Sequence, residues 1–186
     1  MEPLTAQITL HMVSSLDGYI AKKDNSIGWF ETTCEYEKGV VWHSPEDILK
    51  NIDCYVMGAG TYEHALELSK EHGWPYGDTP TVVVTHREIP RVRPHIEFYA
   101  GDLSELVRQR LAPRYKNIWV VGGAALANEF LRLGLADEIR LAILPILLGE
   151  GLPFFDGAGK EQTLRLLDTV AYNNGLLELT YAIKKE

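Results

Sequence analysis

The sequence predicts an α/β fold: a three-layer sandwich in which helices flank a mainly parallel sheet that ends in a C-terminal antiparallel hairpin. First, apolar β-branched runs alternate with segments of helical periodicity from Ile8 to Ile143, and parallel strands need such crossovers. Second, Leu164–Tyr172 and Leu176–Lys184 flank Asn173-Asn174-Gly175, residues that tolerate positive φ in a hairpin turn. Third, 186 residues with 46% hydrophobic content suit one core, so we expect a single domain over residues 1–186.

Turn and capping residues set the limits of the elements in the first half of the chain. The dipeptide Asp17-Gly18 stops the first strand. Ser44 supplies a capping hydroxyl and Pro45 occupies the first helical position. The elements expected here are a strand at Ile8–Ser14, a helix from Ser44 to about Ile52, a strand at Cys54–Met57 closed by Gly58, a helix at Tyr62–Glu71 ended by Gly73, and a strand at Thr81–Thr85.

The second half of the chain repeats the alternation twice. The run from Arg87 to Arg93 contains Pro90 and is followed by Pro94, so we expect a solvated loop there. Gly134 is expected to end a helix as its C-cap. The elements expected here are a helix at Leu103–Leu111, a strand at Ile118–Val121, a helix at Ala124–Leu133 and a strand at Glu138–Ile143.

Charge and cysteine usage exclude several classes of partner. The formal net charge is −8 and the pI is near 5.3, so nucleic acid and anionic membranes are not expected partners. The two cysteines, Cys34 and Cys54, form neither a disulfide framework nor a zinc site. Residues Met1–Gln7 lack a signal sequence, and no run approaches the roughly 18 apolar residues of a membrane span. We therefore expect a cytoplasmic protein.

Two strand-to-helix junctions carry small residues that suit an anion. In Val120–Ala125 the strand runs through Gly122 and Gly123 into a helix, where missing Cβ atoms and the helix dipole favour a pyrophosphate. The alternative is a tight corner without a ligand. In Met57–Tyr62, Thr61 offers a hydroxyl and an N–H to an anion, or serves as an ordinary N-cap.

A third junction, Thr85-His86-Arg87, places hydrogen-bonding groups and a cation after a strand. Arg87 is either a surface charge or a partner for a phosphate. Because ligands of open α/β sheets bind beyond the carboxyl ends of the strands, these junctions are the first candidates for a site.

Four segments occur in the order typical of dihydrofolate-reductase-like proteins: SSLDGYIA (Ser14–Ala21), MGAGTYE (Met57–Glu63), TVVVTHR (Thr81–Arg87) and VVGGAALANEFL (Val120–Leu131). The chain most resembles the C-terminal reductase domain of bifunctional riboflavin-biosynthesis deaminase-reductases, and LPILLGEGLPFF (Leu144–Phe155) resembles that branch as well.

The resemblance implies a dihydrofolate-reductase-like fold and NADPH as cofactor. It places the nicotinamide near Val13, Ile20 and Ala21, the phosphates at Gly58 and Thr61, the adenosine end at Thr85, His86 and Arg87, and the pyrophosphate over Gly122, Gly123, Ala124, Ala125 and Leu126.

The chain also departs from its relatives. Many of them carry basic residues where this chain has Ala59 and Gly60, so NADH is a possible cofactor beside NADPH. Asp47 resembles the acid that folate reductases place early in their first helix, but the Ser44 cap already explains it, and the spacing from helix to strand is several residues shorter than in folate reductases. Asp17 is a second candidate acid, although an Asp-Gly turn has local reasons of its own.

Aromatic residues and acids follow the first strand. Trp29 and Phe30 line the substrate side in one interpretation and anchor the core in the other; Glu31, Glu35 and Glu37 add nearby carboxylates. His11 and His43 lack partners at the spacing of a metal site, so we expect no metal.

The first hypothesis for function is an NADPH-dependent reductase of a small heterocyclic or carbonyl substrate, similar to 5-amino-6-(5-phosphoribosylamino)uracil reductase. Hydride transfer needs few side chains because the cofactor carries the chemistry. The alternatives are a nucleotide-binding protein of the same fold without turnover, and an interaction module that binds no nucleotide. The apolar segment Leu144–Phe155 predicts a homodimer interface.

Overall fold

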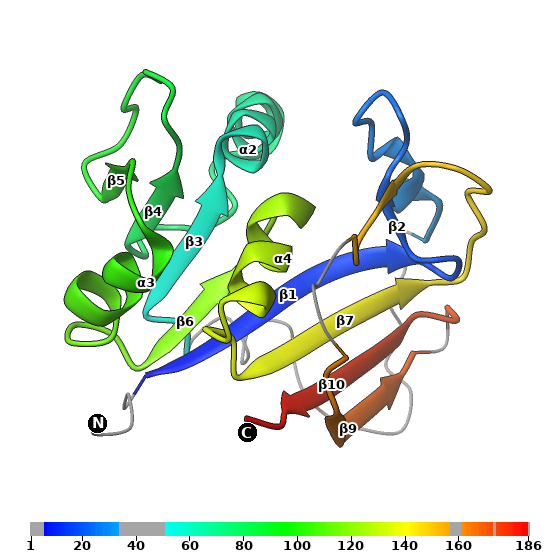
Figure 1. Ribbon diagram of the computed structural model, residues 1–186. Coiled ribbons are helices and arrows are strands. Elements are labelled where there is room, and N and C mark those ends of the chain that lie inside the picture. Colours follow the sequence, from blue (N-terminus) through cyan, green and yellow to red (C-terminus); the bar gives the residue numbers. More distant parts are fainter. Residues whose placement is uncertain (1–5, 34–50, 157–160, 173, 186) are drawn as a thin grey trace.

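The computed structural model describes residues 6–33, 51–156, 161–172 and 174–185. In this part of the chain eight strands form one sheet in the order β5-β4-β3-β6-β1-β7-β10-β9 (Figure 1). Neighbours from β5 to β7 are parallel, whereas β10 pairs antiparallel with both β7 and β9. The expected α/β fold, with a mainly parallel sheet and a C-terminal hairpin, is confirmed.

The central strands are apolar because the sheet is covered on both faces. Every residue of β3 (Cys54–Gly58) except the last is buried, and β6 (Asn117–Val120) is buried after its first residue, as expected for parallel strands between two layers. The other strands of the sheet are β1 (Gln7–Ser15), β4 (Thr81–Val84), β5 (Ile96–Tyr99), β7 (Glu138–Leu144), β9 (Leu164–Ala171) and β10 (Leu177–Ile183).

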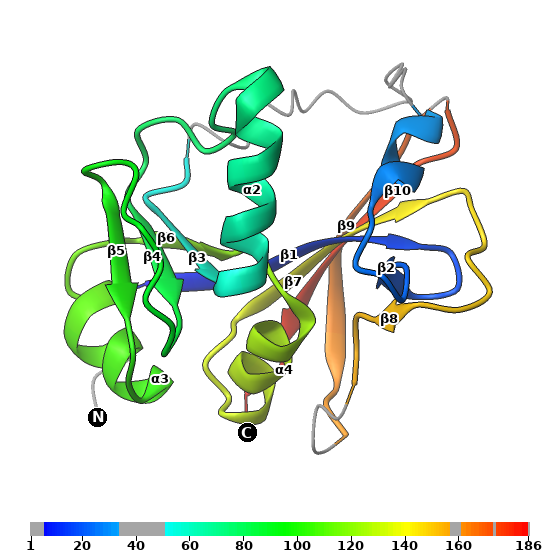
Figure 2. The same ribbon diagram turned by 90° about the horizontal axis from the view of Figure 1, so that it is seen from above.

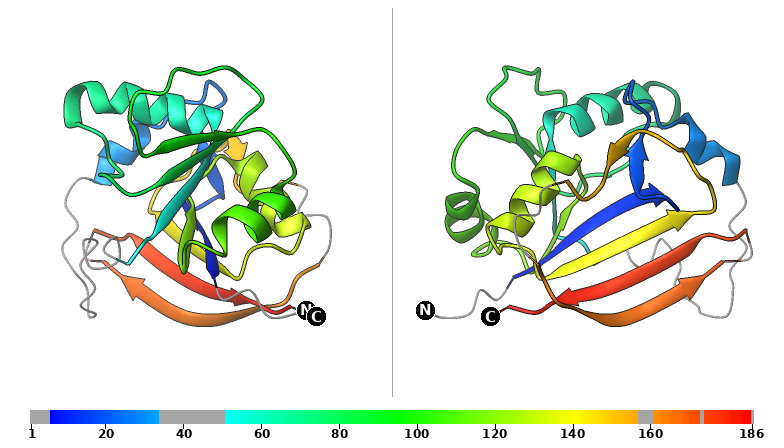
Figure 3. Two further views of the ribbon diagram at one scale, coloured as in Figure 1. Left: turned by 90° about the vertical axis from the view of Figure 1, so that its left-hand side faces the viewer. Right: turned by 45° about the vertical axis from the view of Figure 1, so that its right-hand side comes forward.

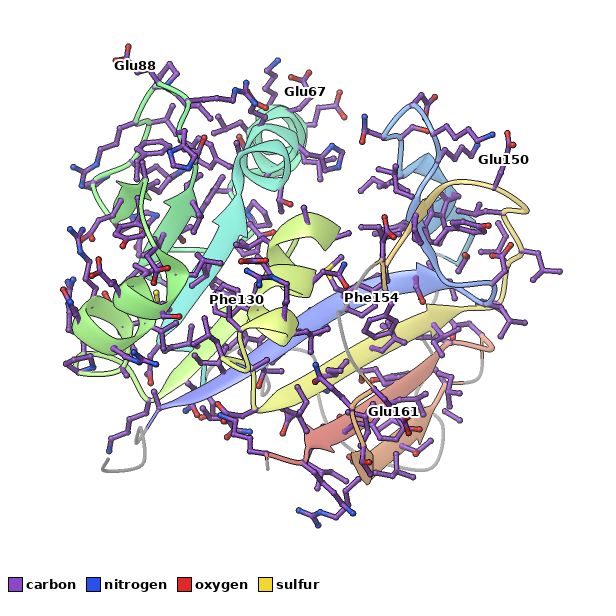
Figure 4. The ribbon with its side chains drawn as sticks, viewed as in Figure 1. Glu67, Glu88, Phe130, Glu150, Phe154 and Glu161 are labelled. Atoms are coloured by element: carbon purple, nitrogen blue, oxygen red, sulfur yellow. The ribbon has the colours of Figure 1, made fainter. Side chains whose placement is uncertain are left out.

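Helices cover opposite faces of the sheet, with α2 on one side and α3 and α4 on the other (Figure 2). Tyr62 of α2 packs in a cluster with Met57 and Trp119. Phe130 of α4 and Phe154 belong to the cluster on the other face, in front of β1 and β7 (Figure 4). The helical segments are η1 (Gly28–Thr33), α2 (Ala59–His72), α3 (Leu103–Glu105), which continues into the π-helical η2 (Leu106–Leu111), and α4 (Ala124–Arg132).

The antiparallel hairpin extends the sheet beyond β7 (Figure 3). Its turn is closed by a hydrogen bond of 2.9 Å from the Gly175 amide to the Tyr172 carbonyl. Gly175 has φ +86°, a left-handed conformation that favours glycine. The turn therefore forms where the sequence predicts it.

Two elements differ from their expected limits. Helix α2 begins at Ala59, three residues before the expected Tyr62, because Gly58 and not Thr61 is its N-cap. Strand β5 (Ile96–Tyr99) was not expected, since four residues after a proline-rich loop are too few to show a periodicity. It pairs with β4 from Thr81↔Ile96 to Val84↔Tyr99. Most of the helix expected from Ser44 lies outside the described residues.

The apolar segment Leu144–Phe155 is used partly within the chain. Leu144 and Phe154 are fully buried, whereas Leu147 and Phe155 are exposed. Its short strand β8 (Leu152–Pro153) pairs with β2 (Tyr19–Ala21). Only part of this segment is free for the expected interface, and the homodimer stays a prediction.

Candidate functional site

The carboxyl ends of six parallel strands lie at one edge of the sheet. Helix α2 follows β3 and helix α4 follows the neighbouring β6, but the two helices pack on opposite faces. In open α/β sheets, ligands bind beyond the strand ends at such a change of side. The first and second junctions therefore meet at the place where a ligand is expected.

A glycine pair, Gly122 and Gly123, lies at this meeting point and forms the glycine floor. The Gly58 amide donates a hydrogen bond of 2.8 Å to the Gly122 carbonyl, and the Gly122–Gly123 peptide bond is cis. Gly122 has φ +118°. A Cβ added to it would lie 3.2 Å from Thr61 Oγ1 and 3.4 Å from Met12 Sδ. The positive φ favours glycine at Gly122, and the space for a side chain there is tight.

Two helices begin at this floor without side-chain caps. The N-caps are Gly58 for α2 and Gly123 for α4, and neither has a side-chain cap hydrogen bond. The first-turn N–H groups of an α-helix have no partner within the helix and carry its positive dipole end. Thr61 is not the N-cap that one interpretation proposed; its hydroxyl lies against the glycine pair.

The third junction lines an open pocket of about 570 Å³ at the ends of β4 and β5. The Arg87 amide donates a hydrogen bond of 2.9 Å to Thr85 Oγ1. The Arg87 guanidinium makes two contacts with the Glu63 carboxylate, one of them 3.0 Å long. Arg87 is therefore an ion-paired residue and not an isolated surface charge. The residues lining the pocket are Thr85, His86, Arg87, Glu88, Ile89, Pro90, Phe98, Tyr99 and Ala100.

The residues expected near a nicotinamide come from β1 and β2 and do not share one cluster. Val13 packs beside Trp29 and Phe30, while Ile20 and Leu126 pack against the cluster on the α4 face. Ala21 is buried. A Cβ on Gly151 would come within 2.3 Å of the Ala21 carbonyl oxygen, so this glycine allows the close approach of β8 to β2.

Asp17 holds a loop in place. Its carboxylate accepts hydrogen bonds from Ser15 Oγ at 2.5 Å and from the amides of Leu148 at 3.1 Å and Gly149 at 2.7 Å. The hydrogen bond from Ser15, followed by those from the two amides, lowers the pKa of Asp17. These contacts favour the structural interpretation, because a carboxylate that stays ionised is a poor proton donor near neutral pH.

Trp29 is a core residue. It is 4% exposed and packs with Ala142, Leu144 and Val170. Phe30 is half-buried and meets the Trp29 ring edge to face at a centroid distance of 4.4 Å. The anchoring interpretation fits Trp29, whereas Phe30 retains a partly accessible ring.

Five candidates are not placed by the structure. Glu35, Glu37, His43 and Asp47 lie outside the described residues, as does the side chain of Glu31. The hypothesis of Asp47 as an acid therefore stays a prediction.

Sequence reasoning missed a polar network that crosses the sheet on the α2 face. The His11 ring lies 4.6 Å from that of Trp119. Arg140 Nε donates a hydrogen bond of 3.0 Å to Glu178 Oε1, and the Tyr172 hydroxyl donates one of 2.9 Å to Glu178 Oε2. The sequence signal for this network is the presence of charged residues within the largely apolar strands β7 and β10. Only the register of the two strands places Arg140 beside Glu178. The network therefore depends on strand pairing.

Burial makes His11 sensitive to acid. Desolvation, with a smaller contribution from Arg140, lowers the pKa of His11 to about 4, against about 6.5 in an unfolded chain. The folded state therefore binds fewer protons than the unfolded state between these pH values. The stability that neutral His11 contributes is complete above pH 6.5 and is lost as the pH falls toward 4.

We expect His11→Phe, which keeps a ring on Trp119, to lose less stability than the wild type on acidification. The difference should reach about 2–3 kcal/mol at pH 4 relative to pH 7. Urea denaturation of both proteins across this range measures it. Parallel curves for the two proteins would show that His11 already titrates near its ordinary pKa.

Metal and membrane features are absent from the part of the chain that the structure describes. Its His, Cys, Asp and Glu side chains form no group of three or more that is arranged to hold a metal ion. None of its helices has the length and apolar character needed to cross a membrane.

Burial raises the pKa of the Cys54 thiol to about 12, so this cysteine is an inert core residue.

Comparisons with known proteins identify relatives over most of the chain. The family model described as the RibD C-terminal domain matches residues 6–177. The uncharacterized protein YwjB of Bacillus subtilis is 31% identical over 167 residues, which cover 90% of this chain and 92% of YwjB. The riboflavin biosynthesis protein RibD of Corynebacterium ammoniagenes is 28% identical over 78% of this chain, but the match covers only 44% of that protein.

Solved structures show the same fold. A putative riboflavin biosynthesis protein from Shewanella sp. PV-4 superposes with a TM-score of 0.80 at 23% identity, covering 96% of this chain and 99% of the other. A deaminase and 5-amino-6-(5-phosphoribosylamino)uracil reductase from Thermotoga maritima superposes with a TM-score of 0.65 at 17% identity, covering 96% of this chain and 57% of the other.

Proposed function

As this chain belongs to the RibD C-terminal domain family, we propose that it is a reductase that uses NADPH or NADH to reduce a small heterocyclic or carbonyl substrate. The family supports a reductase-type function. The observation that carries the cofactor proposal is the convergence of two uncapped helix N-termini on Gly122 and Gly123. The pyrophosphate of a dinucleotide is negatively charged, which suits such a site.

The backbone at the glycine floor suits this cofactor. Gly122 and Gly123 carry no side chains, and bare backbone lets amides approach a phosphate closely. In the proposed complex the pyrophosphate contacts the amides of Ala124 and Ala125, and Thr61 donates its hydroxyl. Thr85, His86 and Arg87 receive the adenosine end, and Val13, Ile20 and Ala21 the nicotinamide.

The bound cofactor would supply the hydride, so the chain has to position groups and exclude water. Strands β2 and β8 pair with each other beside the carboxyl end of β1. Asp17, which follows β1, accepts hydrogen bonds from the amides of Leu148 and Gly149 in the loop before β8. In the proposed complex, Ile20 and Ala21 would shield the reacting ring from solvent. Since Asp17 is engaged in these contacts, the proton is expected from water or from Asp47.

The substrate proposed first is a ribosylamino-pyrimidine, because the Thermotoga maritima relative is described as a reductase of this compound class. Stopped-flow absorbance should show oxidation of NADPH or NADH when the purified chain is mixed with 5-amino-6-(5-phosphoribosylamino)uracil or a related carbonyl compound. Isothermal titration with each nucleotide measures binding separately from turnover.

The Asp17 carboxylate is engaged in hydrogen bonds and is a poor proton donor. This also favours the second candidate function, nucleotide binding without turnover. Binding without oxidation across a broad panel of substrates would support that candidate. If neither nucleotide binds, the proposed reductase and its alternative are both wrong.

A further inference from the structure

The pocket at the ends of β4 and β5 lies next to the glycine floor. Gly58 pairs with Val84 across β3 and β4, and Val84 pairs with Tyr99 across β4 and β5. A dinucleotide whose pyrophosphate rests on the floor can therefore extend its adenosine end into this pocket. This placement depends on the proposed function above.

A single permanent positive charge lines the pocket. Among its lining residues only Arg87 is a lysine or arginine, and its guanidinium is held by both carboxylate oxygens of Glu63. The first turn of α2 adds no cation, because its residues before Thr61 are Ala59 and Gly60. The positive charge of Arg87, which a phosphate group would need, is thus already paired with the Glu63 carboxylate.

The position of Glu63 is set by its buried neighbour. Tyr62 is fully buried, and its hydroxyl donates a hydrogen bond of 3.1 Å to the Pro90 carbonyl. This contact ties α2 to the loop that follows Arg87. The backbones that carry Glu63 and Arg87 are therefore held near each other by a contact that does not involve the ion pair.

The two cofactors present different groups to such a pair. NADH has a free ribose 2′-hydroxyl, which a carboxylate accepts as a hydrogen-bond donor, whereas NADPH has a phosphate there, which an unpaired arginine accommodates. To bind this phosphate, Arg87 must share its guanidinium with Glu63 or leave it, and in either case the carboxylate lies close to a second anion.

We propose that Glu63 is a specificity-determining residue that disfavours binding of the 2′-phosphate in the pocket, so that the chain binds NADH at least as tightly as NADPH. Glu63 acts by occupying Arg87 and by repelling the 2′-phosphate. The side chains of Arg87 and Glu63 are 62% and 42% exposed, and an exposed pair contributes little to folding. Substitution of Glu63 should therefore change binding and leave the melting temperature unchanged.

The test is the ratio of dissociation constants for NADH and NADPH, measured by isothermal titration at low and at physiological salt. We expect Glu63→Gln to tighten NADPH binding by about 5-fold and to weaken NADH binding slightly, a change in the ratio of about 10-fold. The gain for NADPH should vanish in the double variant Glu63→Gln/Arg87→Gln and shrink at the higher salt.

Glu67→Gln is the matched control. Glu67 lies one turn further along the outer surface of α2 (Figure 4), where it pairs with Lys70, so its loss should leave the ratio unchanged. The inference is overturned if the wild type binds NADPH much more tightly than NADH, or if Glu63→Gln leaves the ratio unchanged, and either result leaves the reductase proposal intact. Failure of the wild type to bind either nucleotide overturns that proposal and this inference with it.

Discussion

Gly122→Ala should weaken the binding of both NADH and NADPH by about 100-fold. Gly122 has φ +118°, and an added Cβ would lie 3.2 Å from Thr61 Oγ1 and 3.4 Å from Met12 Sδ. An alanine there is strained in its backbone and pushes Thr61 away from the glycine floor. Isothermal titration measures the affinity, and circular dichroism at the same temperature establishes that the variant is folded.

Gly28→Ala serves as the control for this experiment. No heavy atom lies within 4 Å of a Cβ built on Gly28, and its φ is not left-handed. This variant should bind both nucleotides as the wild type does. A folded Gly122→Ala protein with unchanged affinity would show that the pyrophosphate does not rest on the glycine pair.

Arg140→Met is expected to lower the free energy of unfolding by about 3 kcal/mol. The side chains of Arg140 and Glu178 are only 16% and 12% exposed, so removal of the guanidinium leaves a carboxylate without its charge partner in a poorly solvated place. Burial by itself raises the pKa of Glu178, but the hydrogen bond and charge of Arg140 outweigh it and the pKa is lowered. The loss of stability should therefore be larger at pH 8 than at pH 5.

The double variant Arg140→Met/Glu178→Met tests this explanation. Replacing both partners of a buried pair by apolar residues is often neutral, so the double variant should recover most of the stability that the single variant loses. Arg132→Met removes the equivalent contact of an exposed pair, Arg132 with Glu129, and should cost less than about 0.5 kcal/mol. Urea denaturation of the wild type, of these three variants and of Glu178→Met gives these differences. If the losses of Arg140→Met and Glu178→Met simply add in the double variant, the coupling is contradicted.

Within the described residues, the local signals that predict the sheet are confirmed for the longer strands and helices. Strand β1 and helix α4 fall within a residue of their expected limits, and the Asn-Asn-Gly turn joins β9 to β10. Strand β5 escaped notice because Ile96–Tyr99 is too short to separate from the preceding proline-rich loop. The sequence does not decide the role of Thr61, because a helix N-cap and a phosphate-binding group can both be a threonine.

The sequence by itself determined the α/β class, the order of the elements and the positions of the glycine-rich junctions. These follow from local conformational preferences and from the spacing of apolar residues, which each segment carries independently of the others. The family resemblance also rests on such local segments, and the match over residues 6–177 supports it.

Only the tertiary structure decided which side chains meet. The pairing of Arg87 with Glu63 joins the end of β4 to α2, and the pairing of Arg140 with Glu178 needs the register of β7 against β10. These residues lie 24 and 38 positions apart in the chain. The sequence around a charged residue does not identify such a distant partner, because the attraction between two charged side chains depends on their distance and solvent exposure in the folded chain. For that reason the cofactor preference of the proposed reductase has to be sought in the folded pocket.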